Sequence, residues 1–187
     1  MKSVFLKKVA IVAIAAVTMS VAVQAQTTTF NKGDNLAGVS IGFGGYYSGA
    51  FYNNVSRMPA ISFYYENCVK DNLFDEKSSL GIGGMLGYTS AKWSDYWKVS
   101  NTVIGARGAL HYAFVDKLDT YTGLMLGYEI VSWKYYDSGF KGSGTAASGL
   151  AFSWFLGARY YFTDTVAAFA ELGYGVAVFN VGVSLKF

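Results

Sequence analysis

The residues best able to do chemistry in this chain are charged side chains that recur within apolar and glycine-rich segments. Three acids, three bases and the single histidine fall on the small, polar face of these segments: Glu66, Arg107, His111, Glu129, Arg159, Glu171 and Lys186. Because an unpaired charge is very costly to bury, these groups are expected to form one network of ion pairs. Such a network supports either a salt-bridged plug or a narrow path for ions or protons.

The spacing along the chain suggests two of the pairs. Arg159 and Glu171 lie on consecutive segments joined by a tight turn at 163–165, in a diagonal cross-strand relation. Arg107 and Glu129 stand in a similar relation across the turn at 115–119. We therefore expect the charges to pair mainly between neighbouring strands.

The composition offers little for metal or covalent chemistry. One His and one Cys make no cluster of metal ligands, so no metal, cofactor-binding or catalytic site is predicted. No Ser-His-acid arrangement stands out around His111, and the sequence indicates no enzyme. Cys68 falls in the expected connection 68–78 and has no partner within the chain, which leaves a free thiol or an intermolecular bridge.

The charged residues must be positioned by β-strands, because hydrophobicity alternates along the chain with a period of two. In the last segment, apolar Val183, Leu185 and Phe187 alternate with Ser184 and Lys186. Eight such segments are predicted as strands: 36–47, 59–67, 79–90, 102–114, 120–133, 149–162, 166–174 and 179–187.

The connections favour an eight-stranded, antiparallel, up-and-down transmembrane β-barrel. Short or intermediate turns at 68–78, 115–119 and 163–165 alternate with long loops at 48–58, 91–101 and 134–148, and the last link, 175–178, is short again. This alternation is typical of bacterial outer-membrane barrels. Long aliphatic side chains oppose the charged face, so lipid is expected outside and the charges inside. A soluble, lipocalin-like barrel would reverse these faces.

The first 25 residues read as a cleaved secretory signal peptide. Lys2, Lys7 and Lys8 precede a 15-residue, largely apolar run, which is shorter than the roughly 20 residues of a membrane-spanning helix. Cleavage is expected between Ala25 and Gln26. The mature chain would then begin with a short periplasmic segment, 26–35, followed by the barrel domain, 36–187.

Charge argues against nucleic acid as a partner. The chain carries 15 Lys and Arg and 12 Asp and Glu, a net charge of +3. Three of the lysines lie in the signal peptide, so the mature chain is neutral. A neutral chain has no electrostatic attraction for phosphate backbones.

Aromatic residues gather near the ends of the predicted strands, as in the interfacial girdles of membrane barrels. Those near the long loops also form a candidate surface for binding: Trp93, Tyr96, Trp97, Tyr135 and Tyr136. The girdle and the binding patch remain alternative interpretations of these residues.

Several stretches resemble known outer-membrane proteins. They are Val181–Phe187, Gly157–Thr163 and Phe169–Gly175. The chain resembles the small eight-stranded barrels of the OmpX/Ail group, the transmembrane domain of OmpA and the outer-membrane β-barrel or porin-family proteins of Bacteroidetes-type bacteria. The resemblance implies that Val183, Leu185 and Phe187 form a C-terminal signal for the barrel-assembly machinery.

Taken with the resemblance, the sequence predicts a monomeric barrel in the outer membrane of a Gram-negative bacterium, with both termini in the periplasm. Its expected partners are outer-membrane lipid and lipopolysaccharide, the assembly machinery and a host or cell-surface ligand bound through the loops. Its expected role is structural or adhesive. The alternatives are a small porin or ion channel and a lipid-modifying enzyme.

Overall fold

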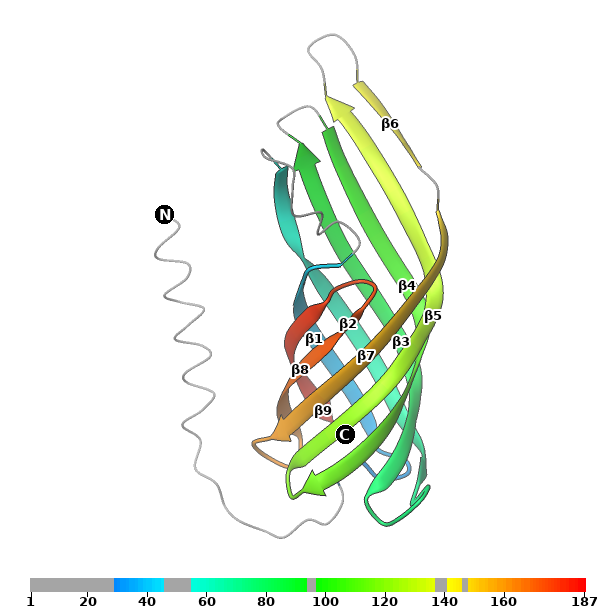
Figure 1. The fold of residues 1–187 in the computed structure, drawn as a ribbon, viewed down its shortest axis with the longest axis vertical. Coiled ribbons are helices and arrows are strands. Elements are labelled where there is room, and N and C mark those ends of the chain that lie inside the picture. The colour runs from blue at the N-terminus through cyan, green and yellow to red at the C-terminus, as the bar shows by residue number, and fades with distance from the viewer. Residues whose placement is uncertain (1–28, 46–54, 94–96, 137–140, 146–147) are drawn as a thin grey trace, which may run out of the picture.

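The computed structural model describes residues 29–45, 55–93, 97–136, 141–145 and 148–187 (Figure 1). Its strands are β1 (Asn35–Phe43), β2 (Val55–Asp71), β3 (Ser78–Trp93), β4 (Trp97–Val115), β5 (Leu118–Tyr136), β6 (Lys141–Thr145), β7 (Gly149–Tyr161), β8 (Val166–Tyr174) and β9 (Phe179–Lys186). Within these ranges, no helix is both long and apolar enough to cross a membrane. The predicted signal peptide and the cleavage position at Ala25 and Gln26 lie outside the described residues.

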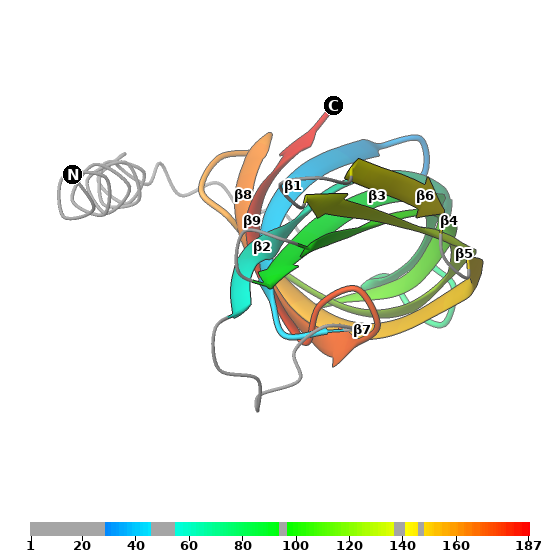
Figure 2. The same cartoon turned by 90° about the horizontal axis from the view of Figure 1, so that it is seen from above.

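The strands form a closed antiparallel barrel, which confirms the predicted fold class. Strands that are neighbours in the chain pair with each other, except that β7 pairs with β5 rather than β6, and β1 pairs with β9 to close the cylinder. Seen from above, the strands curl into a ring (Figure 2). β6 and β7 lie one after the other along the same edge of β5, so together they occupy one position in an eight-stranded barrel.

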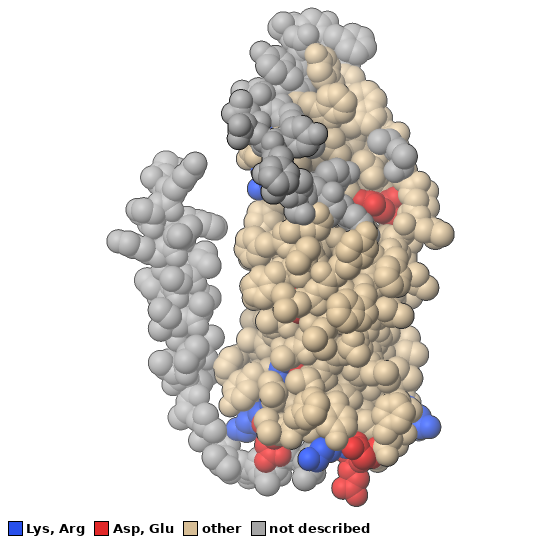
Figure 3. Space-filling view, viewed as in Figure 1, with Lys and Arg blue, Asp and Glu red and all other residues tan. Residues whose placement is uncertain are grey.

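Burial alternates along the strands as the period of two predicted. In β7, Ala151, Phe155 and Arg159 are buried, whereas the alternate residues Phe152 and Leu156 are about half exposed. The same alternation in the other strands leaves large apolar side chains on the outside. Figure 3 shows a wall almost free of charge, with most of the visible Lys, Arg, Asp and Glu near one end. The structure therefore turns its apolar face outward, which excludes the soluble, lipocalin-like alternative.

The two ends of the barrel differ. The turns β2–β3, β4–β5 and β7–β8 lie at one end, here called the turn end, together with the C-terminus (Figure 1). The opposite ends of these strands, Phe43, Val55, Trp93, Trp97, Tyr136 and Lys141 together with the β8–β9 connection, mark the other end, here called the loop end. β4 and β5 have 19 residues each, but β8 and β9 have only 9 and 8, so the wall is much taller on one side.

This uneven wall corrects the expected loop lengths. Most of the predicted loop 91–101 belongs to β3 and β4, which pair as far as Trp93 and Trp97. Most of 134–148 belongs to β5 and β6, and 55–58 belongs to β2. At the loop end these strands carry polar residues on both faces, so hydrophobicity does not alternate there. Strands predicted from alternation therefore stop short of the strands in the structure.

Aromatic rings lie across glycines inside the barrel. Tyr64 faces Gly38 in the β1–β2 ladder, and Tyr121 faces Gly157 in the β5–β7 ladder. A Cβ atom on Gly38 would lie 2.4 Å from the Tyr64 ring, and one on Gly157 would lie 2.5 Å from the Tyr121 ring. Both distances are shorter than van der Waals contact, so only glycine leaves room for these rings. The pairs fill a lumen that is just wide enough for side chains.

Candidate functional site

The centre of the lumen is crossed by a chain of charged hydrogen bonds. Arg107 on β4 donates from Nε to Glu66 Oε1 at 2.6 Å and from Nη2 to Glu171 Oε1 at 2.7 Å. Tyr121 donates its hydroxyl hydrogen to the same Glu171 oxygen at 3.0 Å. Arg107 therefore joins β2 to β8 across the barrel, and its guanidinium bridges two carboxylates.

A second group of charges lies beside the first. Arg159 donates from Nη1 to Asp119 Oδ2 at 2.7 Å, and the same carboxylate lies 2.9 Å from His111 Nδ1. Glu66 Oε2 lies 3.8 Å from His111 Nε2 and 3.9 Å from Arg159 Nη2, which connects the two groups. Side chains in these pairs are at most 7% exposed, so water screens them little.

Aromatic rings enclose both guanidinium groups. The Arg107 Cζ atom lies 4.5 Å from the centre of the Tyr64 ring and 3.9 Å from that of Phe155. Arg159 Cζ lies 4.7 Å from the centre of the Tyr121 ring, and its Nη2 donates to the Tyr64 hydroxyl at 3.0 Å. These ring contacts, together with the ion pairs, offset part of the cost of burying the charges.

The structure brings together five of the seven charged residues singled out in the sequence: Glu66, Arg107, His111, Arg159 and Glu171. Glu129 lies nearer the loop end, where it accepts a hydrogen bond from Asn101. Lys186 lies at the turn end, where Nζ donates to the Thr29 carbonyl at 3.0 Å. The central network therefore excludes Glu129 and Lys186.

The two pairs suggested by spacing are not the pairs that form. Arg107 pairs with Glu66 and Glu171 rather than Glu129, and Arg159 pairs with Asp119 rather than Glu171. Long side chains reach across the narrow lumen, so their partners need not lie on the neighbouring strand.

Asp119 is the acid that sequence reasoning missed, because it was assigned to the turn 115–119. In the structure it belongs to β5 and is fully buried. A signal was present, since Asp119, Tyr121 and Gly123 alternate on one face of the strand. Starting the predicted strand one residue earlier, at 119 instead of 120, would have included Asp119, which faces Arg159 in the β5–β7 ladder.

Cys68 does not lie in a connection as expected. It is part of β2 and only 1% exposed, and among the described residues it forms no disulfide. The predicted connection 68–78 shortens because β2 continues to Asp71. A buried position leaves the thiol no room for an intermolecular bridge in the folded chain.

The candidate surface aromatics are only partly described. Trp97 opens β4, is 47% exposed and pairs with Tyr135 of β5. Trp93 and Tyr136 end β3 and β5, while Tyr96 lies outside the described residues. The structure therefore places Trp93, Trp97, Tyr135 and Tyr136 on strand ends at the loop end.

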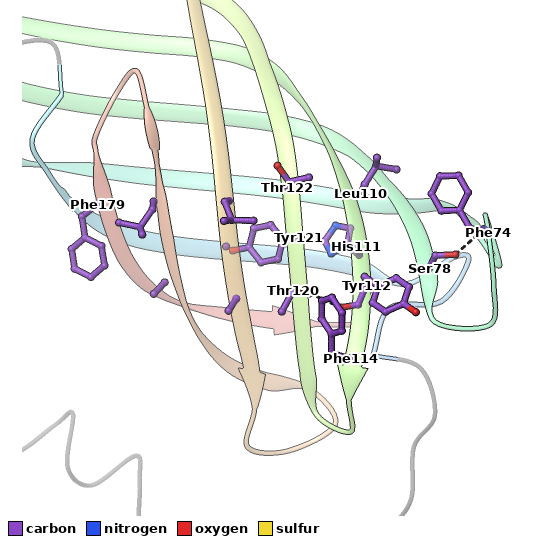
Figure 4. Close-up of a pocket in the computed structure, with 15 residues that line it drawn as sticks. Phe74, Ser78, Leu110, His111, Tyr112, Phe114, Thr120, Tyr121, Thr122 and Phe179 are labelled. Carbon is purple, nitrogen blue, oxygen red and sulfur yellow. Dashed lines mark hydrogen bonds between the residues drawn. The ribbon is translucent and has the colours of Figure 1, made fainter.

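A groove of about 650 Å³ lies on the wall of the barrel near the turn end (Figure 4). Leu110, Tyr112 and Phe114 on β4 and Thr120 and Thr122 on β5 form part of its lining. The groove is almost wholly apolar. It suits hydrocarbon better than a polar substrate.

The carboxylate of Asp75 forms a hydrogen-bonded contact outside the barrel wall. Asp75, in the β2–β3 turn, accepts a hydrogen bond from the Tyr112 hydroxyl at 2.9 Å and another from the Lys77 backbone N–H at 3.0 Å. The Tyr112 bond is the main reason that the pKa of Asp75 falls below its ordinary value of 3.8. This contact fastens the turn to β4.

The central network consists of buried charged groups that a substrate cannot reach. His111 and Asp119 resemble two members of a catalytic triad, yet they are 3% and 0% exposed. No group of three His, Cys, Asp or Glu residues in the described ranges is arranged to hold a metal ion. The geometry is that of a crosslink between strands.

Comparison with known proteins rests on structure. No protein-family model matches the sequence, and no curated protein matches it. Two crystal structures of Ail, the attachment invasion locus protein of Yersinia pestis, are similar to the chain, one of them in complex with the heparin analogue sucrose octasulfate. They have TM-scores of 0.51 and 0.52 at 12% and 10% identity, and each match covers 83% of this chain and 99% of Ail.

The N-terminal β-barrel domain of Pseudomonas aeruginosa OprF is also similar, with a TM-score of 0.48 at 15% identity over 83% of this chain and 98% of that domain. At these identities the likeness establishes fold alone. Together with the closed barrel and its apolar outer face, the match to Ail shows that this chain has the fold of the small eight-stranded outer-membrane β-barrels.

Proposed function

We propose that the protein is an integral barrel of a bacterial outer membrane whose lumen is sealed. It serves a structural role or binds a cell-surface ligand at its loop end. The observation that carries this proposal is the combination of an apolar outer wall with an ion-pair network across the lumen. Lipid can cover such a wall, and the network leaves its charged groups bound to one another rather than to passing ions.

The orientation follows from the difference between the ends of the barrel. Outer-membrane barrels have short periplasmic turns and larger extracellular extensions, and here the extensions are the ends of β3, β4 and β5 that continue beyond β8 and β9. We therefore place the turn end, both termini of the mature chain and the cleavage between Ala25 and Gln26 on the periplasmic side. Val183 and Leu185 on β9 and Phe187 directly after it are more than half exposed, which is consistent with a signal read by the assembly machinery.

The surface role is supported by aromatic side chains at the loop end. Trp97 combines a large apolar area with a polar N–H, a side chain that is enriched in protein interfaces. Outer-membrane lipid and lipopolysaccharide are the proposed neighbours of the wall, and a host or cell-surface ligand is the proposed partner of the loop end. Enclosure of His111 and Asp119 supports a role without catalysis.

The test is the conductance of the folded protein in a planar lipid bilayer. Folding is established beforehand by a shift in gel mobility on heating. A sealed lumen predicts no single-channel openings above the lipid background. Steady openings that change with Arg107→Met would contradict the sealed lumen and make ion transport the leading function.

A further inference from the structure

The chain before β1 turns back into the barrel. Between Asn31 and Asp34 it makes a tight turn, closed by a bond from the Asp34 backbone N–H to the Asn31 carbonyl at 2.9 Å. The Asp34 side chain also accepts from the Asn31 N–H at 2.9 Å, and Gly33 has a φ of +93°, which favours glycine. This turn directs Phe30 toward the lumen rather than away from it.

Phe30 fills the turn end of the lumen. Its side chain is 3% exposed and packs with Cys68, Tyr64 and Tyr161 in one buried cluster. Its ring centre lies 4.7 Å from that of His111. Gly81 makes room for this contact, since a Cβ there would lie 3.1 Å from both rings. Phe30 therefore lies directly against the central ion-pair network.

Scattered hydrogen bonds rather than a strand ladder hold this segment, among them Lys32 N–H to Asp71 Oδ2 at 3.1 Å and Asn67 Nδ2 to the Asp34 carbonyl at 3.4 Å. Gly33 N–H donates to the Cys68 carbonyl at 3.0 Å, and Cys68 N–H donates to the Asp34 carbonyl at 2.9 Å. Lys186 Nζ donates to the Thr29 carbonyl at 3.0 Å and lies 3.8 Å from the Asp34 carboxylate. Residues Thr29–Asp34 belong to none of the barrel strands, which are held by continuous ladders on both sides.

We propose that residues Thr29–Asp34 form a stopper for the turn end of the lumen, in which Phe30 closes the opening and Lys186 holds the segment in place. A segment outside the strand ladders opens far more often than the strands beneath it. Release of the stopper is therefore the first opening event at this end, and it exposes His111 and Cys68 to water while the barrel stays folded. This goes beyond the proposed function, because it concerns access from one end only.

Cys68 is a built-in reporter of this opening. It is the only cysteine in the chain, and its Sγ atom lies 3.8 Å from the Phe30 carbonyl oxygen. Its burial beneath the segment means that a thiol reagent reaches it only when the stopper has moved. The experiment follows the rate at which a small maleimide labels Cys68 in the folded protein, at one pH throughout.

The unmutated folded protein is expected to label at least about 100-fold more slowly than the same protein unfolded in urea. Phe30→Ala removes the ring that closes the lumen, so labelling should quicken by at least about tenfold. Lys186→Met removes the hydrogen bond to Thr29 and should quicken labelling by a smaller factor. Phe74→Ala is the matched control, because Phe74 also lies at the turn end but is 79% exposed and absent from the Phe30 cluster.

Each variant is first checked for folding by its gel shift on heating. If Phe30→Ala does not fold, Lys186→Met decides the matter alone, since it changes only the outer contact of the segment. The proposal is overturned if the unmutated folded protein labels as fast as the unfolded chain. It is also overturned if the folded variants at Phe30 and Lys186 label no faster than Phe74→Ala.

Discussion

Arg107 is the residue whose substitution should destabilise the protein most. It holds Glu66 and Glu171 at once, and all three side chains are nearly or completely buried. Removing one partner of a buried ion pair is more damaging than removing the whole group, because the remaining charge stays in a dry environment. The stability of the network therefore depends on its completeness rather than on any single bond.

We predict that Arg107→Met lowers the free energy of unfolding by about 3–5 kcal/mol, because two carboxylates lose their counter-charge. Urea unfolding of the protein in lipid vesicles, followed by tryptophan fluorescence, measures this change. Lys77→Met, at an exposed position in the β2–β3 turn, is the control and should leave the unfolding curve unchanged.

The triple variant Glu66→Gln, Arg107→Met, Glu171→Gln separates the charge effect from simple loss of packing. Replacing these three charged groups together should recover most of the stability lost in Arg107→Met. Equal losses in the single and triple variants would show that packing, not the unpaired charge, is responsible.

At the scale of strands, periodicity predicts the middle of each element and misses its ends. The eight alternating segments match the barrel strands because a wall with lipid outside and side chains inside imposes a strict period of two. Beyond the lipid, β3, β4 and β5 continue with polar residues on both faces, and the alternation disappears. Asp119 was missed at the opposite end of β5, where it is the second residue of the strand and was assigned to the preceding turn although the alternation includes it.

The members of the candidate site were easier to predict than its pairing. Alternation places a charge on the inner face of a strand, but it does not say how far neighbouring strands are staggered. Arg107 and Glu171 are 64 residues apart and lie on β4 and β8, which do not pair with each other. Their contact depends on the width of the closed barrel, a property of the whole ring rather than of any two strands.

The assignment of the outer face can be tested on one strand. Leu124 lies near the middle of the barrel-forming part of β5 and is 50% exposed. We predict that Leu124→Arg lowers the free energy of unfolding in vesicles by about 2–4 kcal/mol, because arginine is least tolerated at the centre of the bilayer.

Val115→Arg is the matched control for this prediction. Val115 is 59% exposed but ends β4 at the turn end, where the same substitution should cost about 0–1 kcal/mol. Equal effects at the two positions would mean that the wall is not buried in lipid to the depth assigned here.

For the whole molecule, the contact that matters most joins the two ends of the barrel sequence. β1 and β9 pair over eight residues, from Leu36 with Lys186 to Phe43 with Phe179. Asn35 and Phe187 extend this seam by exchanging backbone hydrogen bonds of 2.8 and 3.0 Å. Without it the sheet would have two open edges in lipid, where each unpaired backbone group costs several kcal/mol.

We therefore predict that Val183→Pro abolishes the folded form. Val183 lies inside β9, between Val39 of β1 and Ala168 of β8. Proline has no N–H, so the ladder hydrogen bond donated by this residue would be lost. Proline also cannot be accommodated in the interior of a paired strand. Gel electrophoresis without heating should show the compact band for the unmutated protein and only the unfolded position for Val183→Pro. Val183→Ala keeps the N–H and only shortens an outward side chain, so this control should keep the compact band. A compact band from Val183→Pro would show that the barrel does not depend on closure at this seam.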